Sequence, residues 1–123
     1  MSYIKFTTYD IIILQILTRM IMIDFERIKK DCFWDYDFGD EEISALASSE
    51  NIKERSFLFQ KILLNSTSLF NDLKIFKKHI LQELLENYKV PTFNHDYIFR
   101  RKNLSEVYFF DKPLLVDELK WVA

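Results

Sequence analysis

Glycine and proline are scarce in this chain of 123 residues, which has one glycine and two prolines. Tight β-hairpins need residues that tolerate a positive φ angle, and glycine is the usual choice. Because the chain has so few such residues, helices joined by short polar turns are favoured over a sheet of hairpins. The sequence therefore predicts an all-α fold, a single-domain bundle of about five or six short helices.

Cysteine is also rare, and the net charge is small. Cys32 is the only cysteine, so no internal disulfide can form and a reducing cytoplasm is the expected location. No base lies immediately beside Cys32, which favours a buried apolar role over a nucleophile. The formal net charge of −2 gives no general attraction to nucleic acid or to an anionic membrane, and no membrane partner is expected.

No apolar run is long enough to cross a bilayer, which takes about 20 residues. Residues 1–23 are still unusual, with seven isoleucines and no clear helix-start signal. They could form an extra helix or strand over the core, or a weak membrane-associating segment. They could instead be translated from upstream of a true start at Met20 or Met22. The last interpretation is favoured, because a regular helix pattern starts at Asp24. The expected division is an apolar segment at 1–23 and a helical domain at 24–123.

Patterns that carry catalysis or hold a metal are missing as well. There is no glycine-rich phosphate loop and no serine on a nucleophile elbow. An EF-hand loop counted from Asp35 would have Asp40 and Leu46 where it needs glycine and glutamate. His79 and His95 have no further ligands at zinc spacing. The sequence therefore predicts a non-enzymatic protein with no cofactor and no metal.

What the chain does have is apolar surface, with 49% hydrophobic and 16% aromatic residues, enough for a packed core. Apolar spacing predicts helices over 24–30, 41–47, 48–65, 67–76, 78–88 and 94–110. Asp24, Asp40 and Asn94 are the expected N-caps. The apolar stripe of 48–65 is broad, which is typical of a central helix contacted from two sides. Pro113 should end the last helix, and 114–121 would be a short helix or an extended tail.

Three consecutive bases, Arg100, Arg101 and Lys102, fall on the last predicted helix. With the preceding helix and the turn near Pro91, this segment resembles a helix-turn-helix, so DNA contact through the triplet is the alternative functional hypothesis. Successive residues turn by about 100° around a helix, however, so at most two of the three bases share a face. Bases extending around a packed helix are the simpler interpretation. The inner face of this helix is expected to consist of Tyr97, Ile98, Leu104, Val107 and Tyr108.

The most specific local feature is the run Phe-Trp-Asp-Tyr-Asp-Phe at 33–38, just before Gly39. Neither a helical nor a strand period places its aromatic residues on one face, which predicts a defined turn packed on the core. Asp35 and Asp37 are expected to cap backbone amides there. Acidic residues exceed basic ones by ten to four over 24–54, whereas bases exceed acids by seven to four over 72–102. This polarity suits either ordinary solvated faces or an oppositely polarised partner.

Four stretches, at 33–38, 41–43, 57–63 and 88–91, resemble those of short bacterial proteins whose genes tend to lie beside nucleotidyltransferase-type toxin genes. The resemblance extends from about residue 24 to residue 121. It implies an antitoxin-like or accessory role, with the product of an adjacent gene as the partner and control of the operon as a further function. The expected contact residues are Trp34, Tyr36, Asp40, Glu41 and Glu42, and the alternative for Trp34 and Tyr36 is packing in the core. A homodimer is a second expectation.

Overall fold

The computed structural model describes residues 7–12 and 23–116, and within them the chain forms seven helices and no strand. The helices are α1 (described over residues 8–12), α2 (Phe25–Cys32), α3 (Asp40–Ser48), α4 (Ile52–Asn65), α5 (Leu69–Leu73), α6 (Lys78–Asn87) and α7 (His95–Phe110). The all-α bundle predicted from the scarcity of glycine is confirmed. None of the helices in the described ranges is long and apolar enough to span a membrane.

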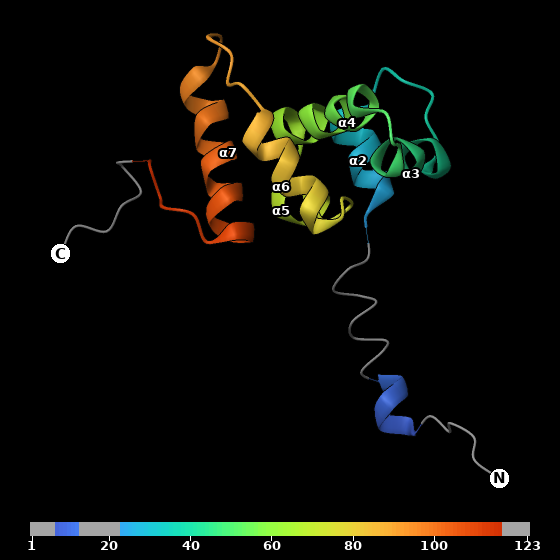
Figure 1. Ribbon diagram of the computed structural model, residues 1–123. Coiled ribbons are helices and arrows are strands. Elements are labelled where there is room, and N and C mark those ends of the chain that lie inside the picture. The colour runs from blue at the N-terminus through green and yellow to red at the C-terminus, as the bar shows by residue number, and fades with distance from the viewer. Residues whose placement is uncertain (1–6, 13–22, 117–123) are drawn as a thin grey trace.

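Helix α4 is the central element, as its broad apolar stripe predicted. It packs against α2, α3, α5 and α7, and Figure 1 shows it between α3 at one end of the bundle and α7 at the other. Leu58, Phe59, Ile62 and Leu63 of α4 are buried, whereas Ile52 in its first turn is 62% exposed. The core around α4 is completed by buried residues of α2, α3, α5, α6 and α7 and of the connecting segments.

Polar side chains determine where several helices begin. The Asp24 carboxylate accepts a hydrogen bond of 3.0 Å from the backbone amide of Arg27, which confirms the predicted cap of α2. Helix α4 begins later than predicted, because Asn51 is its N-cap and accepts from the amide of Lys53 at 2.9 Å. Asn94 precedes α7 as expected, although it has a left-handed φ of 48° and its side chain makes no capping hydrogen bond.

The expected cap of α3 was wrong by one residue. Gly39 is the N-cap and Asp40 is the first helical residue. The Glu42 carboxylate accepts from the Gly39 amide at 2.9 Å, which satisfies one of the amides left unpaired at a helix start. Asp40 is therefore free of the capping role and instead forms an ion pair of 2.7 Å with Lys29 of α2.

Helix α1 has a start signal that the sequence pattern did not reveal. The Asp10 amide donates to the Thr7 hydroxyl at 3.1 Å, and the Asp10 carboxylate accepts from the Thr7 amide at 3.2 Å, as in a reciprocal capping box. Residues 13–22, with Met20 and Met22, lie outside the described residues. The same is true of 117–121, the larger part of the predicted C-terminal helix or tail.

The inner face of α7 is more polar than predicted. Ile98 is buried, but Tyr97 and Tyr108 are both more than half exposed, and Asn103 is buried in their place. The Asn103 side chain donates to the carbonyl of Pro113 at 3.1 Å and accepts from the amide of Leu115 at 2.6 Å. Asn103 thus holds the extended segment that follows α7 against the helix, a role that an apolar side chain could not perform.

Helix α5 is shorter than the predicted segment 67–76, because it ends at Leu73. Phe76 lies beyond it but is still buried, as the predicted inner face required. Helix α6 ends one residue before the predicted boundary at Tyr88. These differences are confined to helix ends, where neighbouring turns compete with the last helical turn.

Candidate functional site

The aromatic turn, residues 33–38, is fastened to α4 by ring contacts. Phe33 is buried, and its ring centroid lies 5.3 Å from that of Phe38 and 5.9 Å from that of Phe57 on α4. The Tyr36 ring stacks on Phe38 at 5.1 Å and meets Phe57 edge-on at 5.9 Å. The backbone amide of Tyr36 also donates to the carbonyl of Phe33 at 3.0 Å. The predicted packed turn is therefore present, with Phe33 as its anchor.

The same turn presents two aromatic side chains to solvent. Trp34 is 66% exposed and Tyr36 is 40% exposed, so Trp34 belongs to the surface and Tyr36 to its edge. The Lys61 ammonium lies 5.1 Å above the Tyr36 ring, a cation–π contact. A shallow hollow of about 290 Å³ adjoins the turn. Its lining is Tyr36, Phe57, Gln60, Lys61, Leu64 and Asn65.

The acidic residues beside the turn have mixed roles. Glu41 is exposed, whereas Asp40 and Glu42 also make contacts within the chain, the first with Lys29 and the second with the Gly39 amide. Hydrogen bonds to Asp40 and to Glu26 raise the pKa of Lys29, which keeps that ammonium charged. The α3 start therefore retains an exposed negative surface that is partly balanced by α2.

Asp35 and Asp37 do not have the capping role that the sequence suggested. Both are exposed, and within residues 23–116 neither accepts a hydrogen bond from a backbone amide. In the described part of the chain, no group of three or more acidic, histidine or cysteine side chains is arranged to hold a metal ion. These two carboxylates add negative charge next to Trp34.

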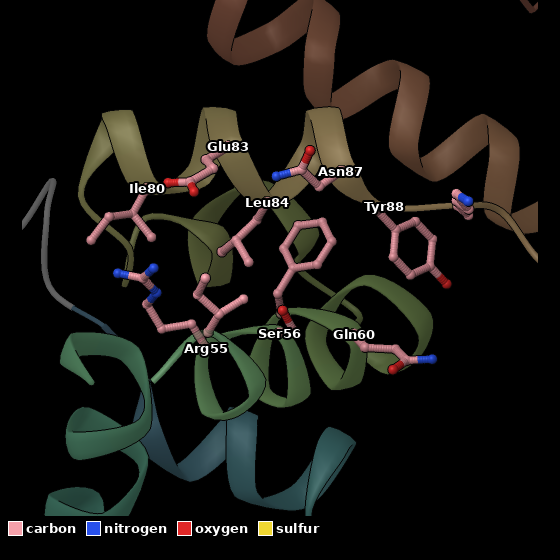
Figure 2. Close-up of a pocket in the computed structure, with 11 residues that line it drawn as sticks. Arg55, Ser56, Gln60, Ile80, Glu83, Leu84, Asn87 and Tyr88 are labelled. Atoms are coloured by element: carbon pink, nitrogen blue, oxygen red, sulfur yellow. The ribbon is translucent and has the colours of Figure 1, made fainter. Parts of the chain in front are cut away.

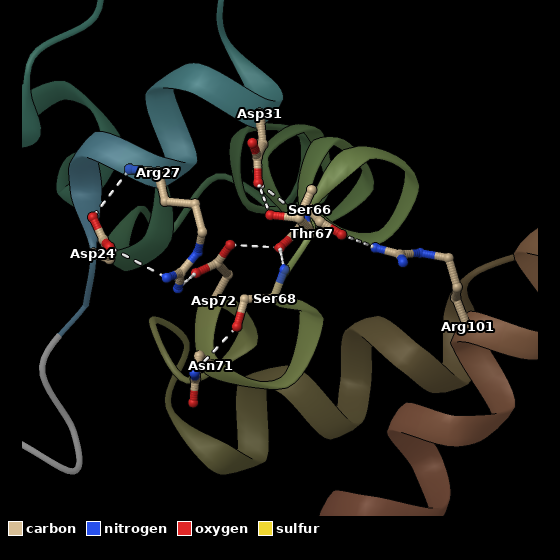
Figure 3. Close-up of polar contacts among 9 residues, drawn as sticks. All are labelled: Asp24, Arg27, Asp31, Ser66, Thr67, Ser68, Asn71, Asp72 and Arg101. Carbon is tan, nitrogen blue, oxygen red and sulfur yellow. Dashed lines mark hydrogen bonds and ion pairs between the residues drawn. The ribbon is translucent and has the colours of Figure 1, made fainter.

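The consecutive bases of the predicted triplet on α7 make different contacts. Arg101 points at the C-terminal end of α4, and its Nη2 donates to the carbonyl of Ser66 at 2.7 Å (Figure 3). Its Nε donates to the carbonyl of Leu63. Carbonyls at a helix end have no partner within the helix, so this arginine satisfies acceptors that α4 cannot. The Lys102 ammonium pairs with Glu106 at 3.3 Å. Arg101 and Lys102 are therefore engaged inside the chain, which weighs against a phosphate-binding face.

A buried carboxylate organises the segment between α4 and α5. Asp72 is fully buried and accepts from Arg27 of α2 at 2.6 Å and from the Ser66 hydroxyl at 2.5 Å (Figure 3). The Ser66 oxygen in turn accepts from the backbone amide of Ser68 at 3.0 Å. The hydrogen bond that Arg27 donates to Asp72 is the largest of the effects that raise the pKa of Arg27. A buried charge of this kind needs such partners, so the network connects α2 to the start of α5.

Two groups next to this network have shifted pKa values. The hydroxyl of Thr67 donates to Asp31 at 2.6 Å, and this hydrogen bond is the main reason that the pKa of Asp31 is lowered. Burial raises the pKa of the Cys32 thiol to about 12, and nearby Asp72 and Asp31 add to the shift. A thiol with this pKa is not a nucleophile at neutral pH, which agrees with the buried role predicted for Cys32.

A second hollow, of about 370 Å³, lies between α4 and α6 and was not indicated by the sequence (Figure 2). We call it the α4–α6 groove. Its lining residues are Ile52, Arg55, Ser56, Phe59, Gln60, Ile80, Glu83, Leu84, Asn87, Tyr88 and Lys89. Two polar atoms of this lining, Nε of Arg55 and the hydroxyl oxygen of Tyr88, are buried without a hydrogen-bond partner among the described residues. Burial also raises the pKa of Tyr88.

Comparison of the chain with protein-family models, with curated proteins and with solved structures gives no match.

Proposed function

We propose that the chain is a non-enzymatic protein-interaction module, an antitoxin-like or accessory partner of a nucleotidyltransferase-type protein encoded beside it. The observation that carries the proposal is the exposure of Trp34 on a turn whose neighbours are packed into the core. Tryptophan and tyrosine supply a large share of the binding energy at protein interfaces. A turn that is already rigid loses little conformational entropy when a partner binds.

The charges beside the turn fit a basic partner. Asp35 and Asp37 flank Tyr36 and are exposed, and Glu41 is exposed at the start of α3. Complementary charge at the edge of an interface mainly speeds association and selects the partner. The proposed contact surface is therefore an aromatic centre, Trp34 and Tyr36, with the acidic residues Asp40, Glu41 and Glu42 at its edge.

The placement of the resembling stretches supports the choice of partner. Residues 33–38 form the turn, 41–43 lie in the first turns of α3, and 57–63 lie in α4 beneath the turn, with Phe57 and Lys61 in contact with Tyr36. Three of the four stretches thus adjoin the proposed surface, although they are separate in sequence. Proteins that share a partner would be expected to resemble one another at the surface that binds it.

The test is co-expression of the full chain with the product of the adjacent gene, followed by size-exclusion chromatography with light scattering. We expect a complex of defined stoichiometry. Trp34→Ala should weaken it by at least about 30-fold, because central aromatic residues contribute about 2 kcal/mol or more. Far-UV circular dichroism should be unchanged, since Trp34 is 66% exposed.

Phe93→Ala is the matched control, because Phe93 is also a large aromatic residue, 61% exposed, but outside the turn. Equal weakening by both substitutions, or no complex with the unmodified chain, would contradict the proposal. Binding of DNA from its own promoter by a homodimer of the chain would instead favour the hypothesis of a DNA-binding regulator.

A further inference from the structure

The α4–α6 groove has the size and the lining of a binding site. Phe59 and Leu84 are buried apolar residues of its two walls, and Ile80 lies at one end (Figure 2). Its volume of about 370 Å³ is within the range of about 300–1,000 Å³ that is usual for ligand pockets, which often lie between helices. A groove of this kind favours the insertion of apolar groups.

Two polar atoms of the groove lack partners, and they lie at its two ends. Figure 2 shows Arg55 beside Ile80 at one end and Tyr88 near Gln60 at the other. Nε of Arg55 and the hydroxyl of Tyr88 are both buried and unpaired within the part of the chain that the structure describes. Buried polar groups are nearly always hydrogen-bonded in folded proteins. Among the described residues three side-chain atoms are exceptions, Nε of Arg27 and these two, and the fact that two of the three fall in one groove points to a ligand that supplies the acceptors.

The remaining polar groups of the groove restrict the kind of ligand. Arg55 can only donate and Glu83 can only accept when ionised, whereas the amides of Asn87 and Gln60 do both. An apolar molecule that carries a negative charge would be repelled by the Glu83 carboxylate. A purely apolar molecule would leave Arg55 and Tyr88 without hydrogen-bond partners. A peptide segment has a carbonyl and an amide at every residue as well as apolar side chains, and it matches the whole set.

The groove is continuous with the surface proposed for the partner. Gln60 of α4 lines both the groove and the hollow beside Tyr36 of the aromatic turn. In Figure 2 the Gln60 end of the groove is also the Tyr88 end. A partner that covers Trp34 can therefore extend across α4 into the groove without leaving the protein surface.

We propose that the α4–α6 groove is the second half of the partner-binding surface and receives a short peptide segment of the same partner. Apolar side chains of that segment fill the space over Phe59 and Leu84, and its backbone carbonyls accept hydrogen bonds from Arg55 and Tyr88. The inference rests on the proposed function for the identity of the partner. The existence of a peptide-binding groove can be tested without that partner.

Tyr88→Phe is the most informative variant for the complex. It removes one hydroxyl but keeps the ring, whose centroid lies 5.7 Å from that of Phe59. We expect the affinity for the adjacent-gene product to fall about three- to ten-fold, the usual effect of losing one hydrogen bond. The free chain should be as stable as before or more so, because the hydroxyl is buried without a partner in the absence of ligand. Tyr108→Phe, the same change at an exposed site on α7, should alter neither quantity.

Ser56→Phe provides a second variant, since it adds a large side chain to the groove between the two ends. We expect it to weaken the complex more than ten-fold by occupying the space of the inserted side chain. If Trp34→Ala disrupts the complex while Tyr88→Phe and Ser56→Phe leave its affinity unchanged, the groove inference is overturned and the proposed function stands.

The partner-free test is titration of the ¹⁵N-labelled full chain with N-acetyl-leucinamide, a single apolar residue with a peptide carbonyl on each side. We expect saturable amide shifts at Ser56, Leu84 and Tyr88 with a millimolar dissociation constant, as suits so small a ligand. The shifts should vanish in Ser56→Phe and persist in Tyr108→Phe. Shifts that do not saturate, or that are equal in Ser56→Phe, would overturn the inference whether or not the partner complex forms.

Discussion

Arg101 offers the sharpest test of how this fold is held together, because it joins two helices that are distant in sequence. Its guanidinium donates to the carbonyls of Leu63 and Ser66 at the end of α4, and a longer contact of 3.4 Å reaches Ile62. Arg101→Met removes these donors while keeping an apolar stem of similar length. The two short hydrogen bonds should each contribute about 1–1.5 kcal/mol, so we expect a loss of about 2–3 kcal/mol in the free energy of unfolding.

Urea unfolding, followed by far-UV circular dichroism, measures this loss. With a slope of about 1–3 kcal/mol per molar urea for a protein of this size, the midpoint should fall by about 0.7–3 M. Arg101→Lys should lose most of the same stability, because a single ammonium cannot contact two carbonyls as the planar guanidinium does.

Lys102→Met is the control, since Lys102 is the adjacent base and, among the described residues, forms its ion pair with Glu106 one turn away. Such a pair on a helix contributes about 0.3–0.5 kcal/mol. If the midpoints of Arg101→Met and Lys102→Met agree within error, Arg101 does not stabilise the end of α4 and the reasoning is refuted.

Two further predictions concern the buried groups near this helix end. Asp72→Asn should lower the free energy of unfolding by about 2–3 kcal/mol, below the ~3–5 kcal/mol of a fully buried pair because the Arg27 side chain is 27% exposed. In a double-mutant cycle with Arg27→Met, measured by urea unfolding, additive losses would show that the pair is not coupled. Burial raises the pKa of Cys32 to about 12 in the folded chain, whereas in the unfolded chain it is about 8.5. The stability that the buried neutral thiol contributes should therefore be complete below about pH 8.5 and be lost as the pH rises toward 12, because only the unfolded chain releases the proton in that range. Cys32→Ala should therefore lose less stability than the unmodified chain between about pH 8 and pH 11, and equal losses would contradict the pKa shift.

The helices could be predicted because their patterns are local. The breadth of the apolar stripe over 48–65 indicated a central helix, and α4 does pack against α2, α3, α5 and α7. The turn at 33–38 could be predicted because its aromatic residues fit no regular period. The sequence left open whether Trp34 lies at the surface or in the core, because a tryptophan among aromatic residues has the same local pattern whether it points inward or outward.

The features that the sequence did not reveal depend on contacts between distant segments. The sequence did not distinguish Arg101 from the two bases that follow or precede it, because the carbonyls at the end of α4 that it contacts lie 35 to 39 residues earlier. The burial of Asn103 could not be predicted from the apolar spacing of the helix, because its hydrogen-bond partners, Pro113 and Leu115, lie beyond the end of the helix. The groove requires α4 and α6 to lie side by side, and no spacing within either helix shows that.

Because the chain is synthesised from its N-terminus, the contact between Arg101 and the end of α4 can form only after α4 has been made. Arg101 is 38 residues beyond Leu63, so the end of α4 is already made while the side chain that seals it has not been translated. At about 5–20 residues per second, this interval lasts about 2–8 s. During that time the last carbonyls of α4 can bond only to water or to their near neighbours, and the central helix should fray at this end on the ribosome. Once α7 is complete, Arg101 can donate to these carbonyls. The contact that fixes the end of α4 is therefore expected to form late in the synthesis of the bundle.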